Sequence, residues 1–113
     1  MACLFCSIVK REIPANILFE DDNLIAFHDI RPQAPTHILV IPKEHIPTLN
    51  DANNEKEALL GRMILTAKDL AKKSHLDEYG YRLVFNVNAG GGQEVFHIHL
   101  HLIGGRQMTW PPG

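Results

Sequence analysis

Three histidines alternate with aliphatic residues near the C-terminal end of the chain, at His97, His99 and His101. In an extended strand, side chains two residues apart share one face, so these imidazoles lie ~7 Å apart at Cα. Such a row can hold a catalytic metal, or one ring can be a nucleophile that its neighbours orient and supply with protons. Three core histidines paired with backbone groups are the structural alternative, but burying three polar rings requires many partners.

A glycine-rich segment, residues 86–94, leads directly into this histidine row. Its three consecutive glycines permit close backbone approach, and successive N–H groups can form a concave site for an anion. Most glycine-rich loops are simple turns, but one that adjoins three histidines favours phosphate chemistry. A catalytic metal would need a third ligand and a general base, and neither is evident nearby in the sequence. The pattern therefore favours a nucleophilic histidine.

Five short strands and two helices are predicted to position these residues. The expected strands are residues 17–20, 24–28, 37–41, 81–87 and 97–103, where β-branched and aliphatic runs lie between turn-forming residues. A short helix is expected over residues 7–14, ending at Pro14. One long helix between the third and fourth strands predicts an α+β fold with an antiparallel sheet.

The long helix is expected over residues 54–74. Asn54 can cap its first turn, and Glu57 can complete a capping box. A stripe that should face the core recurs at helical spacing, at Leu59, Met63, Ala67 and Leu70. After the last strand, the glycine- and proline-rich residues 104–113 should be extended.

The composition describes one globular domain that spans residues 1–113. This length suffices for a single core that does not depend on a disulfide between the two cysteines. The formal net charge of −2, without a basic stripe, argues against nucleic acid as a partner. The first residues lack a signal peptide, and the longest aliphatic run, residues 38–41, is too short to span a membrane. We therefore expect a cytoplasmic protein with reduced thiols and no membrane partner.

The run His97-Ile98-His99-Leu100-His101-Leu102-Ile103 resembles the signature of the histidine-triad (HIT) superfamily. Further segments resemble its Hint branch, the purine nucleoside phosphoramidases; they are residues 27–30, 33–37, 91–93, 104–108 and 110–113. The resemblance covers nearly the whole chain. It implies a HIT-like homodimer whose subunits each contain a five-stranded antiparallel sheet, one main helix and a short N-terminal helix.

The same resemblance implies hydrolysis of the phosphorus–nitrogen bond in adenosine or guanosine phosphoramidates, which releases AMP or GMP and an amine. By the family's pattern, His99 attacks phosphorus without a metal, and water then hydrolyses the nucleotidyl-histidine. His97 and His101 would orient and polarise, and His37 would join their hydrogen-bond network. The reference pKa of histidine, about 6.5, leaves such a nucleophile mostly neutral at neutral pH.

The resemblance also implies where the nucleotide binds. Asp29 would accept the ribose hydroxyls, and backbone N–H groups from Gly92 to Val95 would contact the phosphoryl oxygens. The apolar residues that would hold the purine are Phe5, Ile8, Phe27, Ile30 and Leu39. The remaining expected contacts are His28, Asn86, Gln93, Glu94, His99, His101 and Trp110, the last working in the partner subunit's site. Core packing is the alternative for each apolar residue, and a turn is the alternative for Asp29.

Two positions depart from the pattern of some relatives. Glu94 stands where some of them carry a serine that contacts phosphate, and Arg31 replaces a small hydroxyl residue. Both substitutions leave the nucleophile intact but bear on substrate preference.

Cys3 and Cys6 form a Cys-x₂-Cys pair, which is half of a tetrahedral zinc site. Some members of the superfamily pair such cysteines with two histidines, and the matching residues here are His45 and His97. We expect a structural zinc that anchors the N-terminus. Two unconnected thiols are the alternative, and a thioredoxin-like redox role is disfavoured because the pair opens the chain instead of following a strand.

Two rival functions remain open at this stage. One is a nucleotide-binding regulatory or interaction module in which turnover is incidental. The other is a second activity of the same superfamily, dinucleoside polyphosphate hydrolysis or nucleotidyl transfer. The flanking segments favour the phosphoramidase.

Overall fold

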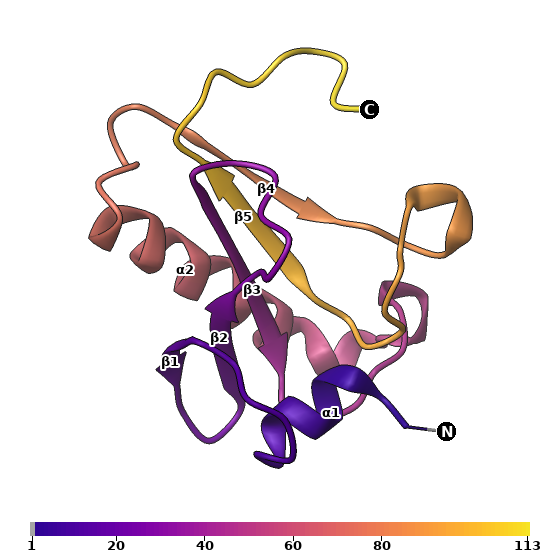
Figure 1. Cartoon of the computed structure of the whole chain (residues 1–113). Coiled ribbons are helices and arrows are strands. Elements are labelled where there is room, and N and C mark those ends of the chain that lie inside the picture. Colours follow the sequence, from indigo (N-terminus) through magenta and orange to yellow (C-terminus); the bar gives the residue numbers. More distant parts are fainter. Residues whose placement is uncertain (1) are drawn as a thin grey trace.

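The computed structural model describes residues 2–113 and is built around one five-stranded antiparallel sheet (Figure 1). Its strands lie side by side in the order β1-β2-β3-β5-β4. Their bounds are β1 Ile17–Glu20, β2 Leu24–His28, β3 Thr36–Pro42, β4 Tyr81–Phe85 and β5 Leu100–Gly104. The predicted α+β class, the five strands and the antiparallel pairing are therefore confirmed.

Helix α2 (Glu57–Lys73) covers one face of the sheet, where it packs against β3, β4 and β5. The predicted core stripe is confirmed, since Met63, Ala67 and Leu70 are buried and Leu59 packs against them. These side chains meet every second residue of the central strands, such as Leu100. None of the helices described in residues 2–113 is long and apolar enough to cross a membrane.

The short helix α1 (Leu4–Val9) lies on the opposite face. Phe5 and Ile8 pack there against the alternate strand residues, such as Phe27 and Leu39. His101 is the β5 partner of Leu39, so the catalytic candidates share this face. The larger hydrophobic core thus lies between the sheet and α2, and the histidines lie on the opposite face, which α1 covers.

The bounds of both predicted helices are wrong: the first helix ends at Val9 and not at Pro14, and both helices start at other residues than expected. The expected helix at residues 7–14 begins instead at Leu4, because the Cys3 sulfur accepts from the Cys6 N–H and caps it. The long helix begins at Glu57, after the 3₁₀ turns η1 (Leu49–Asp51) and η2 (Asn54–Lys56). Asn53 caps η2, so the capping box expected from Asn54 and Glu57 does not form.

Two strands are shorter than the pattern predicts. β4 ends at Phe85, and a short 3₁₀ turn, η3 (Ala89–Gly91), follows it. β5 begins only at Leu100, because Ile98 donates its N–H to the carbonyl of Ile46, outside the sheet, at 2.7 Å. The histidine row therefore straddles the start of the strand.

Candidate active site

The side chains of the three histidines in the row do not form a single cluster. The His101 ring meets that of His37 on the neighbouring strand, with 2.9 Å between His101 Nδ1 and His37 Nε2. The ring of His99 lies beside His101, with centroids 4.9 Å apart. The ring of His97 instead faces Cys3 and Cys6. One row of residues thus supplies two different clusters.

His99 is held in the tautomer that a nucleophile requires. Its Nδ1 lies 2.8 Å from the carbonyl oxygen of His97. A carbonyl can only accept, so Nδ1 carries the proton and Nε2 keeps its lone pair. Burial lowers the pKa of His99, which keeps the ring neutral at pH 7. The ring of Phe5 packs edge-on against it, with centroids 5.0 Å apart.

His37 and His101 form a relay whose direction is fixed by the backbone. The Gln33 N–H donates to Nδ1 of His37 at 3.0 Å, so the proton of His37 lies on Nε2 and is donated to Nδ1 of His101. The proton of His101 therefore lies on Nε2, which is buried and has no partner among residues 2–113. Burial, followed by the neighbouring His99 and His37, lowers the pKa of His101 to about 4. The relay therefore ends in the Nε2–H group of a neutral His101, which is free to donate a hydrogen bond.

Asp29 borders this relay just beyond the end of β2. Its Oδ1 accepts from the Arg31 N–H at 2.8 Å, so the turn that was the alternative for this residue is present. Its Oδ2 lies 3.4 Å from Nε2 of His37. One carboxylate oxygen therefore serves the turn, and the other lies at the relay.

The glycine-rich loop offers fewer free donors than its sequence suggests. The N–H groups of Gly92 and Gln93 are taken by the carbonyls of Ala89 and Asn88. The Gln93 side chain is also fully engaged, accepting from the Asn88 N–H and donating to the carbonyls of Pro47 and Val95. Within residues 2–113, the N–H groups of Glu94 and Val95 meet no acceptor. The four-donor cradle expected from Gly92 to Val95 is thus reduced to two donors.

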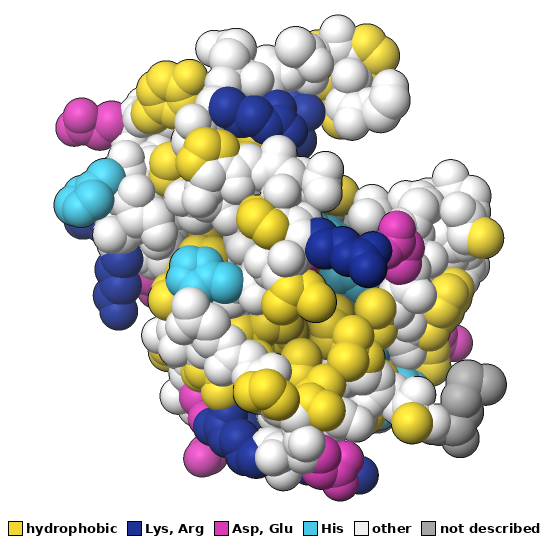
Figure 2. All heavy atoms as spheres, in the orientation of Figure 1, with side chains coloured by type: hydrophobic (Ala, Val, Ile, Leu, Met, Phe, Trp, Pro, Cys, Tyr) yellow, Lys and Arg dark blue, Asp and Glu magenta, His cyan; other side chains and the backbone are white. Residues whose placement is uncertain are grey.

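The apolar residues predicted for the purine site separate into two groups. Phe5, Ile8, Phe27 and Leu39 form one buried cluster under α1. Ile30 is 89% exposed and lies outside that cluster. On the surface, apolar side chains gather in the centre of the view of Figure 2, and both basic and acidic side chains lie at the margin of this patch.

The remaining predicted contacts are scattered around this face. His28 and Asn86 are half-buried at the ends of β2 and β4, and Val95 packs against the α1 cluster. Glu94 is exposed, and Trp110 is 83% exposed on the C-terminal tail. Ile30 and Trp110, both predicted nucleotide contacts, are therefore mostly exposed to solvent in this chain.

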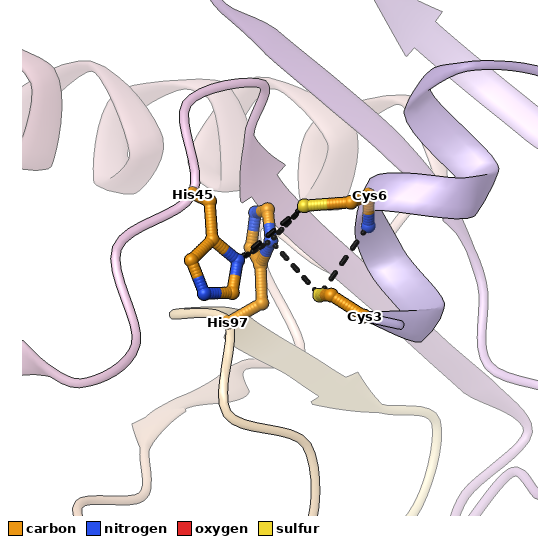
Figure 3. Close-up of side chains that lie close together, drawn as sticks. All are labelled: Cys3, Cys6, His45 and His97. Carbon is orange, nitrogen blue, oxygen red and sulfur yellow. Dashed lines mark hydrogen bonds between the residues drawn. The ribbon is translucent and has the colours of Figure 1, made fainter. Parts of the chain in front are cut away.

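Cys3, Cys6, His45 and His97 converge beside α1, where the four side chains point toward one another (Figure 3). The Cys6 sulfur lies 3.3 Å from Nδ1 of His45 and 3.5 Å from Nδ1 of His97, and the two nitrogens are 3.2 Å apart. A tetrahedral zinc with ordinary bond lengths would separate sulfur from nitrogen by about 3.5 Å and nitrogen from nitrogen by about 3.4 Å. The residues present therefore fit a zinc ion.

The tautomer of His97 also fits a metal ligand. Its Nε2–H donates to the carbonyl of Pro42 at 2.7 Å, which leaves the lone pair of Nδ1 among the cysteines. The ring consequently does not face His99, and only the backbone carbonyl of His97 does. The sequence could not reveal this division, because the decisive partners are the backbone groups of Pro42 and Gln33.

Comparison with known proteins gives a consistent result. The HIT domain family model matches residues 10–108. The purine nucleoside phosphoramidase of Escherichia coli (strain K12) is 54% identical over 93% of this chain and 88% of its own. A HIT family hydrolase from Legionella pneumophila Philadelphia 1 has a TM-score of 0.97 and 65% identity, covering 99% of this chain and 100% of its own. A HIT family hydrolase from Clostridium thermocellum has a TM-score of 0.92 and 44% identity, covering 95% and 93%.

Proposed function

The chain belongs to the HIT domain family, and on that premise we propose that it is a purine nucleoside phosphoramidase. Its substrate is an adenosine or guanosine phosphoramidate, and its products are the nucleoside monophosphate and an amine. The observation that carries this function is the pairing of a lone pair on Nε2 of His99 with an N–H donor on Nε2 of His101. The rings of the two residues are adjacent, with centroids 4.9 Å apart.

In the proposed reaction, Nε2 of His99 attacks phosphorus, and the phosphorus–nitrogen bond breaks as the nitrogen takes a proton from solvent and leaves as the amine. Water then attacks phosphorus, its oxygen stays on the nucleoside monophosphate, its proton returns to solvent, and the phosphorus–Nε2 bond breaks to restore the lone pair of His99. One water is therefore consumed in each turnover. Negative charge on the phosphoryl oxygens would be stabilised by Nε2–H of His101 and by the free N–H groups of Glu94 and Val95. His37 holds the tautomer of His101 and so keeps its donor in place.

We place the nucleoside beside these groups. The purine would lie against the apolar cluster that contains Phe5, Ile8, Phe27 and Leu39. The ribose hydroxyls would reach Oδ2 of Asp29, the oxygen that the turn leaves free. Its proximity to Nε2 of His37 supports this assignment, since the relay would then border both ribose and phosphate.

A single-turnover reaction with an adenosine–amine phosphoramidate tests this function. Transient adenylylation of His99, trapped by acid quench and located by mass spectrometry, is the expected result. Faster turnover of a dinucleoside polyphosphate would instead identify the rival hydrolase. Tight AMP binding without a covalent intermediate would identify the interaction module.

We also propose that the cluster of Cys3, Cys6, His45 and His97 holds a structural zinc. The ion would have no open coordination position, and its role would be to anchor α1. The donor–donor distances and the tautomer of His97 support this proposal. Protein purified without chelator or histidine tag should contain about one zinc per chain. Less than about 0.2, unchanged when both cysteines are replaced by serine, would exclude the site.

We further propose that the protein is a homodimer. We also propose that it acts in the cytoplasm, where its thiols stay reduced. β4 is an edge strand of the sheet, and α2 exposes Ile64 and Leu65, apolar residues that a second subunit would cover. Trp110 protrudes from the tail and would serve the partner's site. Sedimentation of the protein at micromolar concentration distinguishes a dimer from a monomer.

A further inference from the structure

The turn that carries Cys3 and Cys6 is linked to the catalytic candidate His99 through two neighbouring residues, Phe5 within the turn and His97 opposite its cysteines. We propose that this turn positions the nucleophile, so that the loss of a metal bound at the cysteines slows the attack of His99 more than it weakens nucleotide binding. The inference rests on the proposed function, because it concerns the same histidine. It makes Phe5 a positioning residue for the reaction, in addition to a wall of the purine site.

The first link runs through Phe5, which lies between the two cysteines on α1. Its ring is 4% exposed and stands edge-on to the ring of His99 at an interplanar angle of 83°. It makes similar contacts with His97, at 5.9 Å between centroids, and with Phe27, at 5.6 Å. An aromatic ring wedged among three others limits how far the imidazole of His99 can swing. The apolar cluster under α1 holds Phe5, and because α1 has only six residues, a metal bound to Cys3 and Cys6 would fix its position further.

The second link runs through His97, which belongs to both clusters at once. Its Nδ1 lies among the ligand atoms, 3.4 Å from the Cys3 sulfur, and its carbonyl accepts the Nδ1 proton of His99. A bound ion would fix the ring of His97 at one end, as the Pro42 carbonyl does at the other. The carbonyl that fixes the tautomer of His99 would then be rigid as well. Orientation and tautomer of the nucleophile thus both depend on residues that meet at the cysteines.

The metal-ligand cluster is accessible from solvent. A pocket of about 250 Å³ opens beside the ligands, lined by both cysteines together with Ser7, Lys10, Glu12 and His45. The side chain of His45 is exposed, in contrast to the fully buried His97. A chelator or a competing thiol can therefore approach from solvent. The core under α2, on the other side of the sheet, need not open.

The test compares zinc-loaded protein, chelator-stripped protein and the double variant Cys3→Ser, Cys6→Ser. Its readouts are the single-turnover rate of adenylyl transfer, the AMP dissociation constant, and the rate at which diethyl pyrocarbonate acylates His99. Exposed His75 serves as the internal reference for acylation. Removing the metal should lower the transfer rate about fivefold or more, whereas the AMP dissociation constant, which also depends on Phe5 as a wall of the purine site, should change by a smaller factor. Acylation of His99 relative to His75 should rise about threefold, because Phe5 no longer covers the ring.

Phe5→Leu keeps the metal ligands and should reproduce the faster acylation, with zinc content unchanged. Phe19→Leu is the matched control, since Phe19 packs against the cluster under α2 and should leave His99 acylation unchanged. An unchanged transfer rate together with unchanged acylation of His99 in stripped protein and in Phe5→Leu would overturn the proposal. If no form hydrolysed a phosphoramidate, the proposed function would fail, and the acylation rates would still decide whether the turn positions His99. Should the serine variant unfold, stripped wild-type protein and Phe5→Leu carry the test.

Discussion

Two groups of metal-ligand side chains lie on the same face of this molecule and differ in what they can do. In each group, the ligand atoms all lie within 4.8 Å of one another; one group is Cys3, Cys6, His45 and His97, and the other is Asp29, His37 and His101. At His97, the Nε2–H donates to a backbone carbonyl, so the lone pair of Nδ1 faces the other ligand atoms of the group. At His37, a backbone N–H donates to Nδ1, so Nε2 carries the proton and points it toward the other members of the group.

The comparison shows that side-chain types alone do not decide between a metal site and a proton relay. The backbone group on the far side of each imidazole selects the tautomer, and the tautomer selects the chemistry. A metal at the second group would have to displace the proton that His37 donates to His101. We therefore propose metal binding for the first group, and for the second group a proton relay that serves His99.

The largest effect is expected at the nucleophile. His99→Ala should lower phosphoramidate turnover about a thousandfold or more, because it removes the lone pair on Nε2 that would attack phosphorus. AMP binding should stay within about tenfold of wild type, or 1.4 kcal/mol. Steady-state kinetics and calorimetric titration measure the two quantities. Retention of a tenth of the wild-type turnover would contradict the assignment of His99.

Breaking the relay should have the next largest effect. His37→Ala removes the donor that keeps the proton of His101 on Nε2, and kcat should fall about a hundredfold. Zinc content should stay at the wild-type level, since His37 contacts no ligand of the first group. Metal analysis and kcat of the same preparation check both statements. The division into two groups would be wrong if zinc were lost along with activity.

The protein should become less stable at acid pH, because His101 of the relay is buried in its neutral form. Burial lowers the pKa of His101 to about 4, below the value of about 6.5 for an unfolded chain. As pH falls from about 6.5 toward 4, the unfolded chain therefore binds protons first, and the free energy of unfolding decreases. His37, whose pKa is also lowered by burial, and His99 oppose a charge on His101, and Asp29 partly offsets them.

Urea unfolding at pH 7 and pH 5 measures this loss. We expect His101 to account for roughly 1–2 kcal/mol of the difference between these two pH values. His101→Asn should flatten the dependence by that amount. A variant whose pH dependence equals that of wild type would show that His101 is not the titrating group.

The smallest effect is expected from the tail. Deleting residues 107–113 removes Trp110 and should change the ratio of kcat/KM values between two amine leaving groups about threefold. The melting temperature should hardly change, because the exposed Trp110 contributes little to the core. Equal kcat/KM ratios for every amine would show that the tail does not reach a site.

The sequence predicted the parts of this protein that depend on periodicity. Alternating aliphatic residues placed the five strands and the shared face of His99 and His101 correctly, and helical spacing identified the buried side of α2. The failures occurred where a single loop contact decides the outcome. The N–H of Ile98 binds a loop carbonyl and delays β5, and the side chain of Gln93 holds the glycine-rich loop from within. Neither partner is marked by residue type or spacing.

Side chains along β5 alternate between the two faces of the sheet, and this alternation limits where a residue can be inserted or deleted. Leu100 and Leu102 face α2, while His101 faces α1, so one strand encodes the core and the catalytic face together. Adding or removing one residue between His99 and Leu102 would turn a histidine into the core and a leucine into the active face. A single-residue insertion or deletion in this stretch should therefore not be tolerated.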